Sequence, residues 1–339
     1  MVQLADACLS QETALLAIVE QSLQNELRRT LTPVGAIYLH MTQGGGKRIR
    51  PGLILACNRL YSPDCGSAIP VAVAAELIHM ASMAHDDVID QADMRRGLPT
   101  VNHHWDSWTA VLVGDALLAR ALGLLVETRQ PGILRLMADM LKEMCEGEIS
   151  QNRALLKMDL SEAEYLNCIQ KKTALFFAVC CQSGALLGGC PSPDAQALWQ
   201  YGYRLGMAFQ MIDDLLDVNA KPETWGKPIG ADVAAGVMTL PLIRAMQDPK
   251  YGKEIRKQVL TWRSILRRAK RGRRSTARRN SRHVQQLLAL IQATDALEYT
   301  RRRAQEYARS AIGCIPANTD PAAKARLTEL VDSVVHRQS

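Results

Sequence analysis

The sequence predicts an all-α protein, and three observations carry this prediction. Apolar residues recur at the three-to-four-residue spacing of an amphipathic helix along most of the chain. Aromatic residues make up only 5% of the 339 residues, so the core consists mainly of Leu, Ala, Val, Ile and Met, which favours helices over sheets. No run of alternating apolar and polar residues, and no Asn-Gly hairpin signal, indicates a strand.

The predicted helices follow one another from the N-terminal end. In the first, Leu15, Leu23 and Leu27 recur at helical spacing with charges between them. Further apolar stripes cover residues 68–90, 106–128, 133–156, 162–189, 195–219, 284–313 and 321–336. Prolines lie almost entirely between these stripes, where a helix begins or ends. We therefore expect a single domain spanning residues 1–339, long enough to bury a large core.

Composition and the first residues point to the cytoplasm. Hydrophobic residues at 47% and charged residues at 22% are typical of an ordinary soluble protein. The nine cysteines have no CxxC or Cys/His metal spacing, which is typical of reduced thiols. Residues 1–6 lack the basic region of a signal peptide, and polar residues interrupt the apolar stretch 174–190.

A basic segment, residues 263–283, differs from the rest of the chain. It carries ten Lys or Arg and no acidic residue, while the whole chain has a net charge of +7. We expect a solvated loop insertion between helices. The alternative is peripheral contact with an anionic membrane, where each basic residue contributes about 1 kcal/mol. Nucleic acid is not an expected partner, because no aromatic residue is interleaved with the charges.

The first aspartate cluster has the form DDxxD and ends a long apolar helix. It consists of Asp86, Asp87 and Asp90. Asp86 and Asp90 are four residues apart and share one helix face, where like charges repel. Such a pair persists if solvent screens it or a cation lies between the carboxylates. Mg²⁺ suits the second case, because it takes carboxylate oxygens and keeps waters or phosphate oxygens.

A second DDxxD cluster repeats this spacing, with Asp213, Asp214 and Asp217. One such cluster is more often surface charge than a metal site. Two clusters, each within an apolar helix, predict a site for several Mg²⁺ ions with these six aspartates as candidate ligands.

Basic residues elsewhere would complement such a site with anion-binding groups. A glycine run at residues 44–46 leads into Lys47 and Arg50, and can wrap an anion with amides and cations. It is not a Walker P-loop, because no Ser or Thr follows the lysine. Further candidates are Arg95, Arg96, Lys172, Thr173 and Lys227.

Nine motifs, in order, resemble the trans-polyprenyl diphosphate synthase family, of the long-chain type such as heptaprenyl or octaprenyl diphosphate synthase. They are GGGKRIRP, ELIHMASMAHDDVID, RRGLPTVN, VGDALLA, EGEISQ, KKTA, FQMIDDLLD, GKPIGAD and TLPLI. The likeness runs from about residue 30 to 245, and more loosely through the last helices. It implies a helical bundle of the isoprenoid synthase type around a deep central cavity, usually a homodimer.

The resemblance also implies a reaction. An allylic diphosphate, farnesyl or geranyl, ionises with the help of Mg²⁺, condenses with isopentenyl diphosphate and loses a proton, repeatedly. Catalytic roles fall on Asp86, Asp90, Lys172, Asp213 and Lys227. The resemblance implies an isopentenyl diphosphate site at Lys47, Arg50, His79 and Arg96, and an allylic site at Arg95, Lys172, Thr173, Gln210 and Lys227.

Product length is implied by residues one or two turns before Asp86. These are Ala81 and Ser82, with Ile78 deeper. Five residues of helix rise about 7.5 Å, so a bulky ring at position 81 would stop a short tail. Because none is present, we expect products longer than fifteen carbons, such as precursors of quinone side chains. A geranylgeranyl-length product is the alternative.

One residue departs from the family pattern, and other functions compete. Val237 stands where the family usually has Lys, which removes a cation. A class I terpene cyclase would have a looser second motif and an aromatic cavity, whereas this chain has three Phe and five Trp. A non-catalytic partner subunit would be expected to lose the aspartates. A further alternative is an active subunit that needs a small helper chain.

Overall fold

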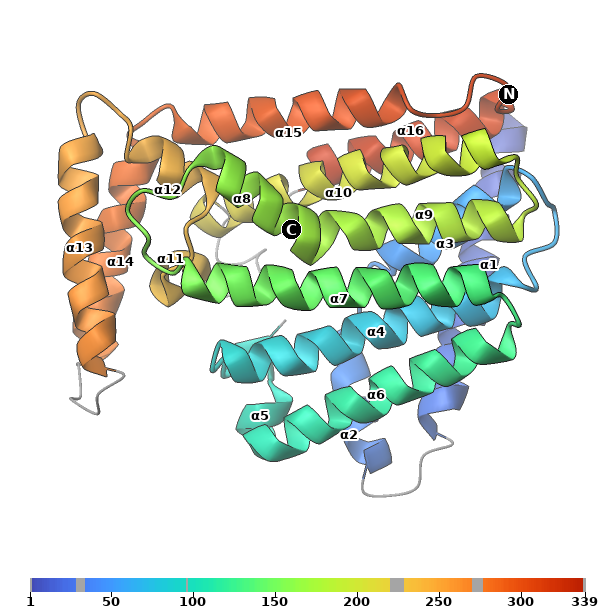
Figure 1. Cartoon of the computed structure of the whole chain (residues 1–339), viewed down its shortest axis with the longest axis horizontal. Coiled ribbons are helices and arrows are strands. Elements are labelled where there is room, and N and C mark those ends of the chain that lie inside the picture. Colours follow the sequence, from blue (N-terminus) through green and yellow to red (C-terminus); the bar gives the residue numbers. More distant parts are fainter. Residues whose placement is uncertain (1, 29–33, 96, 220–228, 270–276, 338–339) are drawn as a thin grey trace. The chain divides into compact units, whose positions relative to one another are not determined.

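The computed structural model describes residues 2–28, 34–95, 97–219, 229–269 and 277–337. The regular secondary structure of these residues is helical apart from one two-stranded ribbon, which confirms the predicted fold class (Figure 1). The chain divides into two compact units, each made of three segments. The first unit comprises Met1–Leu141, Phe176–Tyr203 and Ala311–Leu330, and the second Lys142–Leu175, Arg204–Ser310 and Val331–Ser339.

In the first unit, helix α4 (Ala68–Ile89) packs against four other helices. These are α1 (Val2–Arg28), α3 (Ile49–Arg59), α5 (Val101–His104) and α6 (Ser107–Glu127), while α2 (Val34–Gln43) packs on α1. Glycine allows the closest approaches. A Cβ on Gly114 of α6 would lie 2.3 Å from the His85 ring of α4, and one on Gly184 would lie 2.1 Å from the Ile54 carbonyl oxygen. This packing holds the carboxyl end of α4, where the first aspartate cluster lies.

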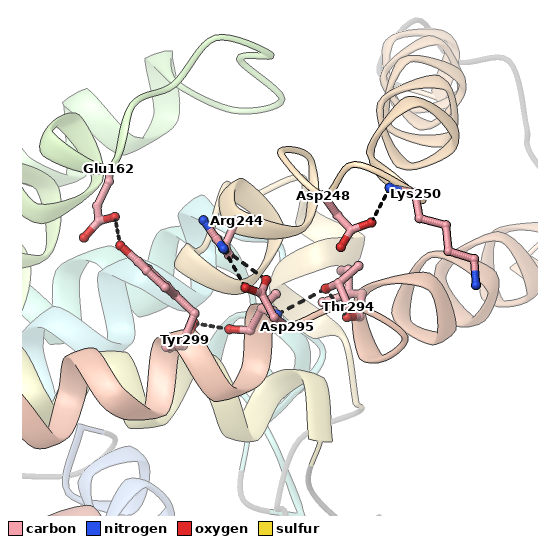
Figure 2. A network of polar contacts seen from close by, with 10 residues as sticks. Glu162, Arg244, Asp248, Lys250, Thr294, Asp295 and Tyr299 are labelled. Atoms are coloured by element: carbon pink, nitrogen blue, oxygen red, sulfur yellow. Dashed lines mark hydrogen bonds and ion pairs between the residues drawn. The ribbon is translucent and has the colours of Figure 1, made fainter.

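The second unit contains α8 (Glu162–Ile169), the π-helical turn η1 (Gln170–Ala174), α11 (Ala231–Ala235), α12 (Leu240–Ala245), α13 (Gly252–Ala269) and α14 (Ala277–Gln292). A polar network around α12 is shown in Figure 2. Arg244 donates to Asp295 at 3.1 and 2.5 Å, and its Cζ lies 4.7 Å from the Tyr299 ring centre. Tyr299 in turn donates to Glu162 at 2.6 Å. The network joins α12 to the first turns of α8 and α15.

The remaining helices are α7 (Pro131–Arg153), α9 (Leu175–Leu187), α10 (Ser192–Asn219), α15 (Ala296–Ile312) and α16 (Pro321–Val335). Two of the predicted stripes are divided. The stripe 284–313 is two helices, α14 and α15, and the Thr294 hydroxyl between them accepts from the amide of Ala296. The stripe 162–189 is interrupted by the π-helical turn. Apolar residues continue through both of these positions, so the periodicity of the sequence does not reveal that the helix is interrupted.

The antiparallel ribbon was not predicted. Strands β1 (Met94–Arg95) and β2 (Leu98–Pro99) pair across a turn that contains Gly97, whose φ is +77°. A glycine adopts this left-handed backbone without steric cost. Strands of two residues are too short to leave an alternating pattern in the sequence.

The expectation of a loop at residues 263–283 is wrong for its described parts. Residues 263–269 end α13 and residues 277–283 begin α14, while 270–276 lie outside the described residues. Arginine has a high helix propensity, so a basic run can continue a helix. Trp262 and His283 stack at 5.5 Å between the two helices, and His283 contacts the Gln258 carbonyl at 3.0 Å.

Two helices, α4 and α6, are long and apolar enough to cross a membrane by length and composition. Most of the apolar window of α4 is buried within the protein, and less than half of that of α6 is. A core helix passes the same test, so these two helices are weak support for a membrane span.

Candidate active site

The first aspartate cluster lies at the carboxyl end of α4, where its members differ in environment. Asp87 is buried, and its Oδ1 accepts from both Nε and Nη2 of Arg95 at 2.8 Å. Asp86 is half-buried and Asp90, the residue that follows α4, is exposed. The middle aspartate is therefore bound within the protein, while the outer pair lies closer to solvent.

The described residues of the predicted isopentenyl diphosphate site belong to the same unit as this cluster. Lys47 is exposed in the loop before α3. Arg50, in the first turn of α3, places its Cζ 4.8 Å from the ring centre of Phe176 and 5.4 Å from that of Phe177, within cation–π range. His79 is half-buried on α4. Arg96 lies outside the described residues.

The second aspartate cluster lies near the end of α10, and both carboxylate oxygens of its middle member, the buried Asp214, accept hydrogen bonds. Tyr165 donates to one carboxylate oxygen of Asp214 at 2.7 Å, and Gln210 donates to the other at 3.0 Å. Thr173 donates to the amide oxygen of Gln210 at 2.7 Å. Burial, and then the nearby Asp232 carboxylate, raise the pKa of Asp214 to about 7, against the lowering effect of the Gln210 and Tyr165 hydrogen bonds.

The outer members of this cluster have different partners. Asp213 is half-buried and forms an ion pair with Arg337, whose Cζ also lies 4.6 Å from the Phe209 ring centre. Asp217 is buried and accepts from the amide of Asp232 at 3.2 Å. Of the three, Asp213 is the one with substantial exposure to solvent.

Lys172 and Thr173 lie in the π-helical turn η1. Such turns are frequent at functional sites, because the extra residue redirects side chains. The Lys172 ammonium lies 2.6 Å from Oε2 of Glu148 on α7. A Cβ on Gly147 would lie 2.8 Å from the Cβ of Lys171, so glycine permits this close approach. Lys227 lies outside the described residues.

The three chain-length residues lie on α4 in the first unit. Ala81 and Ile78 are buried, and Ser82 is half-buried with its hydroxyl donating to the His79 carbonyl at 2.9 Å. No bulky ring occupies these positions, as the sequence requires for a long tail.

Sequence reasoning missed three residues that contact predicted site residues. They are Glu148, Tyr165 and Arg337. Glu148 could have been found, since it belongs to the EGEISQ motif. Tyr165 and Arg337 carry no local signal, because each is far along the chain from its aspartate partner.

The donor set fits magnesium that is shared with a substrate. Among the described residues, no group of three or more His, Cys, Asp or Glu is arranged to hold a metal ion. Mg²⁺ is usually bound through one or two carboxylates together with waters and substrate phosphates. The more exposed carboxylates of Asp86, Asp90 and Asp213 suit that role. Asp214 suits it less, because both its oxygens already accept hydrogen bonds from protein donors.

Comparison with known proteins gives consistent matches. Residues 32–270 match the family model described as polyprenyl synthetase. Heptaprenyl diphosphate synthase component 2 of Geobacillus stearothermophilus is 43% identical over 235 residues, which cover 69% of this chain and 73% of the relative. Octaprenyl diphosphate synthase of Haemophilus influenzae is 34% identical over 94% of this chain and 93% of its own.

A solved structure agrees. The polyprenyl synthase of Caulobacter crescentus, crystallised with calcium and isoprenyl diphosphate, matches with a TM-score of 0.86 at 34% identity, over 99% of this chain and 98% of that one. The chain belongs to the polyprenyl synthetase family, whose members use divalent metal ions and bind prenyl diphosphates. Within it, the chain is a trans-prenyltransferase, a polyprenyl diphosphate synthase.

Proposed function

We propose that the enzyme adds isopentenyl diphosphate repeatedly to farnesyl or geranyl diphosphate and releases a product of heptaprenyl or octaprenyl length. The observation that carries the proposal is the contrast within each aspartate cluster. The middle residue is bound within the protein, by Arg95 at Asp87 and by Tyr165 and Gln210 at Asp214, and an outer residue remains more exposed. This contrast supports cation binding by Asp86 and Asp90 in the first unit and by Asp213 in the second.

We assign the aspartates three roles. Asp86 and Asp90 of the first unit and Asp213 of the second would hold Mg²⁺ ions, while Asp87 and Asp214 orient the helix ends that carry them. The third role is that of Asp217, whose carboxylate accepts from the Asp232 amide and so joins the second cluster to the first turn of α11. When bound, Mg²⁺ supplies positive charge that neutralises the departing diphosphate of the allylic substrate.

The chain's cations bind the two diphosphates. Lys47, Arg50 and His79, together with Arg96, hold isopentenyl diphosphate. Arg50 is well placed for this, because two phenylalanine rings fix its guanidinium. The allylic diphosphate is held by Lys172, Thr173, Gln210 and Lys227, with Arg95 fixed beside Asp87.

Hydrogen bonds within the second unit orient two of the residues that bind the allylic diphosphate. Thr173 and Gln210 form one hydrogen-bonded chain to Asp214, so they are oriented before substrate binds. The double bond of isopentenyl diphosphate then attacks the allylic cation, and the released diphosphate accepts the proton that is lost. Each cycle lengthens the chain by one isoprene unit.

Product length follows from the small residues before Asp86. Ile78, Ala81 and Ser82 carry no bulky ring that would stop a tail growing along α4, so elongation continues beyond fifteen carbons. A product of geranylgeranyl length would require a floor that other side chains provide.

We propose a homodimer formed through α6. Trp108, Val111, Leu112 and Val126 are exposed on this helix, an apolar face of the kind that marks protein interfaces. A small helper chain is the alternative, since one relative is named as component 2 of its enzyme. Light scattering of the purified chain distinguishes a dimer from a monomer, and Leu112→Asp should shift it towards monomer.

We further propose that the chain acts as one cytoplasmic domain, with the ends of the basic segment 263–283 able to contact anionic membrane. Cosedimentation with phosphatidylglycerol vesicles at low and high salt measures that contact. No binding at low salt would contradict it.

The test of activity uses the purified chain alone with farnesyl diphosphate, isopentenyl diphosphate and Mg²⁺. Linear prenyl diphosphates support the proposal, and their loss in EDTA supports the metal's role. Cyclised hydrocarbon would instead indicate a cyclase. Turnover only after a second protein is added would indicate the helper arrangement.

A further inference from the structure

Arg48 lies between two residues assigned to isopentenyl diphosphate, Lys47 and Arg50, and its backbone is unusual. It precedes the first turn of α3 with φ 46° and ψ 40°, the left-handed region that side chains other than glycine rarely adopt. Its carbonyl accepts from the amide of Gly52 at 2.9 Å, so this conformation begins the helix. Something must hold Arg48 there.

The side chain of Arg48 forms a clamp with carboxylates from two other helices. Its Nε and Nη2 donate to the two oxygens of Glu20 on α1, at 2.7 and 3.2 Å. Its Nη1 donates to Oε1 of Glu76 on α4 at 2.6 Å. The Arg48 side chain is only 13% exposed and that of Glu76 only 5%. The hydrogen bond from Arg48 holds the pKa of the Glu20 carboxyl below its usual value.

The contacts of Arg48 indicate a different role from that of its neighbours Lys47 and Arg50. Three of its nitrogens donate to carboxylates, so its guanidinium is directed into the protein and not towards a substrate. The planar fork of arginine suits such a paired contact, whereas the single ammonium of lysine cannot reproduce it. Lys47, by contrast, is exposed.

We propose that Arg48 and Glu76 are positioning residues that set the affinity for isopentenyl diphosphate, an inference that rests on the proposed function. The clamp holds the left-handed backbone at Arg48. That backbone conformation determines the directions in which the Lys47 and Arg50 side chains point. Glu76 also lies three residues before His79 on the same face of α4. One ion cluster thus joins the glycine loop to the helix that carries the third residue of the site.

The test measures KM for each substrate separately in Glu76→Gln, Arg48→Lys and Arg48→Gly. We expect KM for isopentenyl diphosphate to rise about tenfold or more in Glu76→Gln, because small displacements of binding groups have large effects. KM for farnesyl diphosphate should change less than about twofold. Glycine in Arg48→Gly can adopt the left-handed backbone angle but is not held in it. This variant should therefore also raise KM for isopentenyl diphosphate and leave KM for farnesyl diphosphate nearly unchanged. Arg48→Lys should lie between these variants and the wild type.

A matched control is Arg120→Ala, which breaks another ion pair with α1, at Glu26. It should lower the thermal midpoint without separating the two KM values. Calorimetric affinity for isopentenyl diphosphate alone provides a readout that does not need turnover. If Glu76→Gln loses stability as the control does but keeps both KM values, or raises both equally, the positioning role is wrong.

The same experiment distinguishes this inference from the function on which it rests. A wild-type chain that forms no prenyl product contradicts the proposed function. A wild-type chain that elongates normally, beside a Glu76→Gln variant with an unchanged affinity for isopentenyl diphosphate, contradicts only the clamp.

Discussion

Replacing Tyr165 by Phe tests whether the buried partner of the second aspartate cluster supports metal binding. The change removes one oxygen, which donates to Asp214 at 2.7 Å, and keeps the ring. Both residues are buried, and Gln210 is the other donor to that carboxylate among the residues that the structure describes. Water therefore cannot readily replace the lost hydrogen bond.

The loss of stability expected for Tyr165→Phe depends on whether the acceptor, Asp214, is charged. At pH 8, above the pKa of about 7, the Asp214 carboxyl is ionised. Hydrogen bonds to charged groups contribute about 1.5–3 kcal/mol to stability, against about 1 kcal/mol for neutral pairs. We expect Tyr165→Phe to lower the free energy of unfolding by about 2–3 kcal/mol. The control is Tyr201→Phe, which removes a buried hydrogen bond of 2.8 Å to the neutral Leu327 carbonyl and should cost about 1 kcal/mol.

Urea unfolding in EDTA at pH 8 measures the stability difference, and the Mg²⁺ concentration for half-maximal turnover measures the functional one. Tyr165→Phe should raise that concentration, because Asp214 no longer holds the end of α10 in place, while Tyr201→Phe should leave it unchanged. If Tyr165→Phe costs no more stability than Tyr201→Phe, and the Mg²⁺ dependence is the same in both, Tyr165 does not support metal binding.

Four further predictions concern separate parts of the chain. Hydrogen bonds from a lysine and from the start of α8 lower the pKa of Glu164 to about 2, so its stabilisation is present above pH 4.5 and is lost as the pH falls to 2. Glu164→Gln should therefore lower the urea midpoint at pH 7 and match the wild type near pH 2; a constant difference would contradict this. Gly184→Ala places a methyl group 2.1 Å from a carbonyl oxygen of α3 and should cost about 1–3 kcal/mol in urea unfolding, so an unchanged midpoint would count against the packing. Arg337→Ala releases Asp213 and should tighten Mg²⁺ binding measured by calorimetry without substrate, whereas equal or weaker binding would show that the pair does not compete with the metal. Ala81→Phe should shorten the product on chromatography, and an unchanged length would refute its role beside the growing tail.

The sequence predicts the helices best where apolar residues recur without interruption. The long apolar stripe before Asp86 is helix α4, and the stripe before Asp213 is α10. The second cluster therefore lies within a helix, as expected, and the first lies at the end of one, where Asp90 follows the last residue of α4. The ribbon around Gly97 and the π-helical turn at Lys172 were not predicted, because each depends on a few backbone angles and not on a repeating pattern.

The site could be predicted only as a set of residue types. Motifs identified Asp86, Asp213 and Lys172, because the other members of each motif lie only a few residues away along the chain. Their partners are determined by folding, which brings Tyr165 to Asp214 and Arg337 to Asp213 from distant positions. No spacing rule connects such pairs.

Arg48 illustrates the same limit within a recognised motif. It lies beside Lys47, and both residue types are common ligands of anions. Only the contacts with carboxylates on α1 and α4 show that its side chain is used inside the protein.

The central claim is that this chain elongates an allylic diphosphate to a long product. The most direct measurement is the mass of the alcohol obtained after dephosphorylating the product that the purified enzyme makes from farnesyl diphosphate, excess isopentenyl diphosphate and Mg²⁺. We expect a linear polyprenol of heptaprenyl or octaprenyl mass. A product that stops at geranylgeranyl mass, or the recovery of unreacted substrates alone, would contradict the proposed function.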